Sequence, residues 1–118
     1  MVARPRKRRR VCGMPAFKSF GPLDVRDVEE VTLTVEEYEV IRLIDLEKLD
    51  QHACAERMGV GRSTIQRMYE EAREKIADCL VNGKLLRTEG GDYVVCSPDK
   101  GYCSPFYRRR NRAGRGWE

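Results

Sequence analysis

Several features that define large classes of protein are scarce or absent in this sequence of 118 residues. No apolar run approaches the ~20 residues that a membrane-spanning helix needs, so we expect no membrane partner. The basic first ten residues are followed by no apolar segment, and we therefore expect no secretory signal peptide. The chain is also too short for a barrel or a doubly wound catalytic scaffold.

The side chains of known catalytic arrangements are missing as well. The chain has one histidine, His52, which we interpret as a surface residue, and it has neither a Ser/His/Asp set nor a glycine-rich phosphate loop. Five acidic residues are spread around residues 35–47, and we interpret them as a solvated face or as a surface for a basic partner: Glu36, Glu37, Glu39, Asp45 and Glu47. Without a pocket to hold an acid–base pair, we expect neither an enzyme nor a cofactor.

Charge is divided unevenly along the chain. Residues 11–107 carry 12 basic and 18 acidic side chains, whereas the two ends sum to +10 and the whole chain to +4. Residues 1–10 hold six basic residues and no acid: Arg4, Arg6, Lys7, Arg8, Arg9 and Arg10. Arginine pairs well with phosphate, so arms of this composition on an acidic body indicate a nucleic acid as partner. Solvated ends that aid solubility are the alternative.

The five cysteines fall into two groups. Cys54 and Cys79 lie on apolar faces of predicted helices, where a thiol fills the core. Cys12, Cys96 and Cys103 lie outside the helices, and their spacing is wider than the tight pairs of a zinc finger. We expect three unrelated reduced thiols in a reducing cytoplasm. A metal, iron–sulfur or thiol sensor formed where the two ends meet is the alternative.

The sequence predicts a mainly α domain with three helices. Alternation over residues 30–34 indicates a short strand, and Thr34 with Glu37 has the spacing of a capping box that begins a helix over residues 35–47. Asp50 can cap a second helix over residues 51–58, and Gly59 can supply the positive φ of a tight turn. A third helix runs from residue 62 to about residue 81, where Asn82 and Gly83 end it.

The third helix has the clearest apolar period of the chain. Seven residues fall within one arc of about 120°: Ile65, Met68, Tyr69, Ala72, Ile76, Cys79 and Leu80. Two strand-like runs then flank Gly90 and Gly91, and they predict a β-hairpin over residues 84–96 that is structural or a dimer contact. We therefore expect a basic arm over residues 1–14, one domain over 15–97, and a disordered basic tail over 98–118.

Residues 51–70 resemble the helix-turn-helix motif of DNA-binding proteins. Ala55 is small where two helices would cross, Gly59 makes the turn, and Gly61 stands where Ser is usual. The exposed side of the second helix carries side chains suited to base edges, and together with the first residue of the motif they form the predicted DNA-binding set: Gln51, Arg62, Ser63, Thr64, Gln66 and Arg67. Arginine suits the edge of guanine and glutamine that of adenine. The alternative interpretation of the same residues is an ordinary αα-hairpin without a DNA-binding role.

The resemblance extends beyond the motif. A helix ending near Glu47 and followed by this motif is similar to region 4 of sigma factors. Further segments resemble the predicted DNA-binding proteins called domain of unknown function 134, or uncharacterised protein family 0251: residues 3–13, 30–34, 42–47, 55–60, 72–73, 82–84 and 89–91. The resemblance covers about residues 1–95. It implies a cytoplasmic protein of bacteria or archaea, and it argues against a nuclear localisation signal in residues 4–10.

These observations favour a sequence-specific protein that binds double-stranded DNA and regulates transcription. The predicted recognition helix begins at Arg62 and enters the major groove, while the basic ends add nonspecific affinity. Two alternatives stay open, namely a redox- or metal-sensing regulator that uses Cys12, Cys96 and Cys103, and a sigma-like module whose acidic first helix docks another protein. The oligomeric state stays open between monomer and homodimer.

Overall fold

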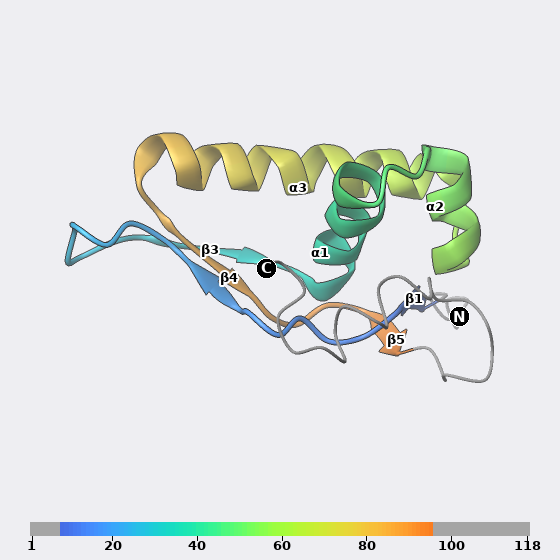
Figure 1. The fold of residues 1–118 in the computed structure, drawn as a ribbon, viewed down its shortest axis with the longest axis horizontal. Coiled ribbons are helices and arrows are strands. Elements are labelled where there is room, and N and C mark those ends of the chain that lie inside the picture. Colours follow the sequence, from blue (N-terminus) through green and yellow to red (C-terminus); the bar gives the residue numbers. More distant parts are fainter. Residues whose placement is uncertain (1–7, 96–118) are drawn as a thin grey trace, which may run out of the picture.

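The structure, a computed structural model, describes residues 8–95, and residues 1–7 and 96–118 lie outside the described part. Figure 1 shows the arrangement of its elements. In chain order they are β1 (Arg9–Val11), β2 (Ser19–Phe20), β3 (Glu30–Leu33), α1 (Val35–Ile41), the π-helical turn η1 (Arg42–Leu46), α2 (Gln51–Met58), α3 (Arg62–Asn82), β4 (Leu85–Thr88) and β5 (Tyr93–Val95). None of the helices in this part is both long and apolar enough to cross a membrane.

The three predicted helices are confirmed, together with the residues that begin and end them. Thr34 Oγ1 accepts a hydrogen bond from the Glu37 N–H at 3.2 Å, and Glu37 Oε1 accepts one from the Thr34 N–H at 3.0 Å, which is the predicted capping box. The first helix differs from the expected one in its second half, where Arg42–Leu46 form a π-helical turn. Gly83, in the left-handed conformation, ends α3 as predicted.

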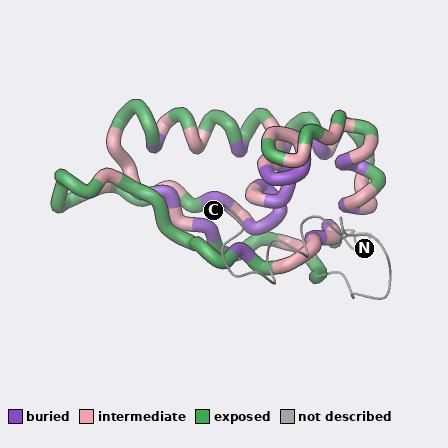
Figure 2. The backbone as a smooth tube through the Cα atoms, viewed as in Figure 1, coloured by how far each residue is buried: buried purple, intermediate pink, exposed green. Residues whose placement is uncertain are grey.

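Helix α3 lies along the longest dimension of the molecule. It runs along one side, α1 and α2 lie toward its N-terminal end, and β3 and β4 pass beneath its C-terminal half (Figure 1). The buried residues, coloured purple in Figure 2, form two clusters. The larger cluster joins α1, α2 and α3 to β1, and it includes Val40, Leu43, Met58 and Ile65. The smaller cluster joins α3 to β3 and β4.

One residue of the predicted apolar stripe of α3 lies outside both clusters. Leu80 is 82% exposed, whereas Ile65, Met68, Ala72 and Cys79 are buried as expected. The prediction for Leu80 was wrong because the narrow sheet beneath the C-terminal half of α3 covers only part of the stripe. The C-terminal half therefore keeps an uncovered apolar side.

The predicted β-hairpin over residues 84–96 is wrong. Strand β4 lies in the centre of a three-stranded sheet, antiparallel to β2 and parallel to β3, while β5 pairs in parallel with β1 in a separate ladder. Both edges of β4 are thus occupied, so the chain cannot fold back onto it. The N–H of Asp92 donates instead to the Glu36 carboxylate, and the Val35 N–H donates to the Gly90 carbonyl, which anchors the crossing segment to the start of α1.

The acidic residues of α1 form no solvated face, which corrects the expectation for them. Glu36, Glu37 and Glu39 are all buried, and Glu39 is only 1% exposed. The N–H of Cys12, just after β1, donates to Glu39, the N–H of Asp92, just before β5, donates to Glu36, and Lys75 of α3 bonds to Glu37 at 2.7 Å. Each carboxylate therefore has an internal partner, and α1 offers no acidic surface made of these three residues.

Candidate nucleic-acid interface

The surface predicted to bind DNA is built on the pair of helices α2 and α3. The Asp50 side chain accepts a hydrogen bond from the Ala53 N–H at 2.8 Å and caps α2. Gly59, at φ 72°, ends α2 in the left-handed conformation that the sequence predicted. Five residues expected between the two helices are buried, and Val60 is half-buried: Cys54, Ala55, Met58, Ile65 and Met68 are the buried ones. This packing fixes how α3 projects from the body.

The first turns of α3 present the predicted base-reading side chains to solvent. Arg62, Ser63, Gln66 and Arg67 are exposed, and Thr64 is half-buried. At ~100° per residue the four exposed positions lie on one side of the helix, opposite Ile65 and Met68. Arg67 is 56% exposed, and its Nη1 lies 3.7 Å from a carboxylate oxygen of Glu71, one turn further along.

Two further observations concern the helix starts. Gly61 is the N-cap of α3 and provides no side-chain hydrogen bond, so the N–H groups of its first turn lack a side-chain partner. Gln51, the predicted phosphate contact, is half-buried at the start of α2. Of the predicted set, Gln51 is therefore less exposed than the four residues on the outer side of α3.

Strand β1 corrects the expectation for the N-terminal arm. A flexible arm through residue 14 is ruled out, because residues 9–11 form a strand beside β5 and Arg9 is only 7% exposed. Arg8 is exposed, with its Nε 3.8 Å from Asp92. Three members of the predicted basic set lie outside the described residues: Arg4, Arg6 and Lys7. Any free arm is therefore shorter than the sequence predicted.

Arg10, predicted only as a DNA contact, also has a structural role. Its Nη2 donates to the Glu56 carbonyl at 2.9 Å and its Nε to the Arg57 carbonyl at 3.2 Å, so it closes the C-terminal end of α2. A positive charge is favoured at this end of a helix. The guanidinium also covers the turn, since a Cβ on Gly59 would lie 2.7 Å from Arg10 Nη1. No local sequence signal indicates this contact, because 46 residues separate Arg10 from Glu56.

A buried ion pair joins Glu39 of α1 to Arg42 at the start of η1. Arg42 donates from Nε and Nη2 to Glu39 at 3.0 and 2.8 Å and bonds to Glu47 as well, and the Cys12 N–H donates to Glu39 at 3.1 Å. Burial alone would lower the pKa of Arg42, but the hydrogen bonds and charge of Glu39 outweigh it and hold that pKa above its ordinary value. The i,i+3 spacing of Glu39 and Arg42 was the available sequence signal.

The cysteines show no arrangement for a metal within residues 8–95. No group of three or more His, Cys, Asp or Glu side chains that could hold a metal ion occurs there. Cys54 is fully buried, and burial with the nearby charge of Glu39 raises the pKa of its thiol to about 12. Cys12 is half-buried, whereas Cys96 and Cys103 lie outside the described residues.

Comparison with known proteins places the chain in a family. A family model described as "Protein of unknown function DUF134" matches residues 1–96, and the chain belongs to this family. A UPF0251 protein of Desulfitobacterium hafniense strain Y51 is 50% identical over 116 residues, which cover 96% of this chain and 93% of the relative. A UPF0251 protein of Halothermothrix orenii is 53% identical over 96 residues, which cover 80% of this chain and 71% of the relative. A UPF0251 protein of Moorella thermoacetica is 47% identical over 119 residues, which cover 99% of this chain and 74% of the relative. No solved structure matches this chain.

Proposed function

We propose that this protein is a sequence-specific binder of double-stranded DNA and a cytoplasmic regulator of transcription, and that α2, the turn and α3 act as a sigma region 4-like helix-turn-helix. The observation that carries the proposal is the exposed N-terminal face of α3, where Arg62, Ser63, Gln66 and Arg67 stand on a buried two-helix wedge. Such a face needs no pocket and no cofactor, so the proposed function is binding rather than catalysis.

The proposed contacts follow from the chemistry of each side chain. The major groove of B-DNA admits an α-helix, and Arg67 and Gln66 can each form two hydrogen bonds with one base edge. Arg62 and Ser63 share this face and would read bases as well, while Gln51 and the N–H groups at the start of α3 would lie near the phosphates that flank the groove. Arg10 would hold α2 at a fixed angle to this face through its two carbonyl contacts.

The charge distribution supports the same partner. The described body carries an excess of acid, but several acids are neutralised internally, as Glu37 is by Lys75 and Glu39 by Arg42. Basic residues of the two ends would supply most of the attraction to phosphate. The proposal therefore divides the work between α3, which reads bases, and the chain ends, which add salt-dependent affinity.

Selection from random duplex DNA, followed by two substitutions, tests the proposal. We expect the parent to select a defined site, and Gln66→Ala and Arg67→Ala to lose roughly 1–3 kcal/mol of discrimination each at one base pair while keeping nonspecific affinity. Arg87→Ala is the matched control, because Arg87 is a partly exposed arginine on β4, beneath the C-terminal half of α3 and away from the reading face. Unchanged base preference in both variants would show that this face does not read bases.

A further inference from the structure

An exposed apolar surface lies at the opposite end of the molecule from the proposed reading face. It consists of five side chains, which we call the distal patch: Phe20, Leu23, Val25, Leu80 and Val81. Leu23 is fully exposed, and the segment over residues 21–29 that carries it projects beyond the C-terminal end of α3 (Figure 1). A contiguous apolar patch with a polar rim is typical of a protein–protein contact.

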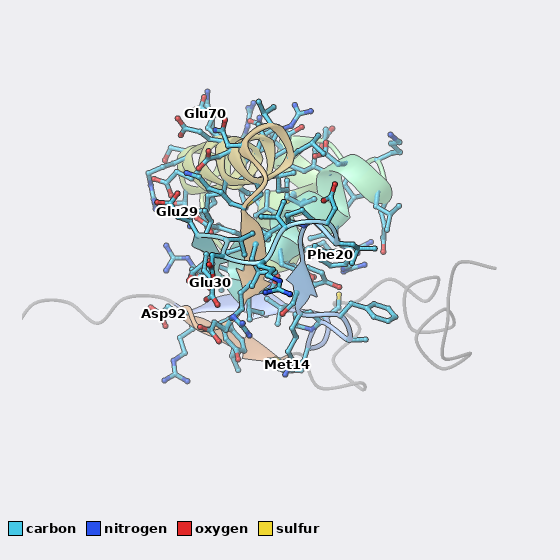
Figure 3. All side chains as sticks on the ribbon, turned by 90° about the vertical axis from the view of Figure 1, so that its left-hand side faces the viewer. Met14, Phe20, Glu29, Glu30, Glu70 and Asp92 are labelled. Carbon is cyan, nitrogen blue, oxygen red and sulfur yellow. The ribbon has the colours of Figure 1, made fainter. Side chains whose placement is uncertain are left out.

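A groove adjoins this patch. It lies between the C-terminal end of α3 and strands β2 and β4, and its volume is about 360 Å³. The side chains that line it are mainly apolar: Phe20, Pro22, Ile76, Cys79, Leu80 and Leu86. The same end of one chain thus carries both a projecting apolar segment and an apolar groove. Figure 3 views the molecule from this side, with Phe20 labelled below the end of α3.

The charges around the patch have both signs, with an excess of acid. Asp24, Asp27 and Glu29 are exposed beside the single exposed base of the segment, Arg26. On the groove side, Lys84 Nζ lies 2.9 Å from Asp78 and 3.3 Å from Glu29. An acidic rim disfavours nucleic acid and anionic lipid as occupants. Asp78 and Glu29 share the single charge of Lys84, so this side of the groove keeps a net negative charge that Arg26 of a second chain can face.

We propose that the occupant is a second copy of this chain, and that two chains pair about a twofold axis through their distal patches. Leu23 and Val25 of each chain would insert into the groove of the other, so the same contact forms twice, as an isologous interface requires. A stable interface buries about 800 Å² on each partner, and the pairing has to reach that size by joining both projecting segments and both grooves.

The pairing has a consequence that rests on the proposed function. Gln66 and Leu80 are 14 positions apart on α3, which corresponds to about 21 Å along the helix. Contact between the C-terminal ends leaves both reading faces free. Two helices inclined to one another there can place those faces about 34 Å apart, one turn of B-DNA. The selected site would then be an inverted repeat.

Sedimentation of the full chain without DNA tests the pairing separately from DNA binding. We expect the parent to sediment as a dimer at micromolar concentration, and Leu23→Asp and Leu80→Asp each to weaken dimerisation by about 30-fold or more, the size of a hot-spot substitution. Both positions are exposed in the monomer, so circular dichroism and thermal unfolding should change little. Met14→Asp is the matched control, because Met14 is an exposed apolar residue outside the patch and groove.

A photo-crosslinking amino acid at position 23 then tests the exchange itself. We expect it to link to residues 76–86 of the other chain in a mixture of two chains that differ in mass. A monomeric parent, or a dimer that keeps its strength in both aspartate variants, would overturn the proposal. Open-ended oligomers in place of a dimer would overturn the twofold arrangement. A dimer that selects no DNA site would leave the pairing intact and contradict only the proposed function.

Discussion

At the scale of single residues, the main difference between expectation and structure is the fate of the charges on α1. The apolar side chains of Val40 and Leu43, within the first predicted helix, are both fully buried. Glu39, in contrast, was expected on a solvated face or on a surface for a basic partner. That expectation failed because β1, which lies far away in sequence, covers the side of α1 that carries Glu39. Arg42 then becomes the local partner that makes the burial of Glu39 tolerable.

The Glu39–Arg42 pair gives a prediction for stability. Arg42→Ala leaves the Glu39 carboxylate buried without its main partner, and we expect it to lower the free energy of unfolding by about 3–5 kcal/mol. Arg87→Ala removes the partly exposed pair with Glu30, which solvent screens, and should lower the stability far less than Arg42→Ala does. Urea denaturation of both variants measures the difference. The double variant Glu39→Gln with Arg42→Met should recover part of the loss, and equal costs for the two arginines would contradict the burial of this pair.

At the scale of elements, helices could be predicted and strand pairings could not. Thr34, Asp50, Gly59 and Gly83 begin or end their helices through contacts within a few residues, so a local sequence is enough to identify them. Strand β4 was predicted to be extended, but its parallel pairing with β3 was not predicted. The predicted hairpin failed because the occupants of the two β4 edges come from residues 19–20 and 30–33, about 50–70 positions earlier.

The segment that crosses between the two sheets can be probed through its two glycines. Gly90 (φ 73°) has open space where a Cβ would stand, whereas a Cβ on Gly91 (φ 115°) would overlap the buried Glu36 carboxylate. We expect Gly90→Ala to cost about 1 kcal/mol of stability and Gly91→Ala to cost about 2 kcal/mol more, because the second must also displace Glu36. Thermal unfolding of both variants measures this difference. A hairpin turn facing solvent would instead give similar costs.

At the scale of the whole molecule, β1 connects parts of the chain that lie far apart in sequence. It pairs with β5, buries Val11 among the helices, and closes α2 through Arg10. The two-helix motif and its exposed face were predictable from one continuous stretch of sequence. The support of that motif by the N-terminal strand was not predictable, because it depends on contacts across more than 40 positions and Arg10 resembles its basic neighbours.

Two truncations separate the structural and electrostatic parts of the N-terminal segment. Removal of residues 1–7 leaves β1 in place, so we expect unchanged stability together with weaker binding to all DNA sequences. Loss of Arg4, Arg6 and Lys7 should flatten the slope of log K against log salt by up to about 0.9 for each phosphate contact.

Removal of residues 1–11 also deletes Arg10 and the fully buried Val11, and we expect it to lower the free energy of unfolding by about 3 kcal/mol or more. Urea denaturation and fluorescence anisotropy across a salt series measure the two effects. An unchanged salt slope for the shorter deletion would remove the arm from the DNA contact, and unchanged stability for the longer one would remove β1 from the folded core.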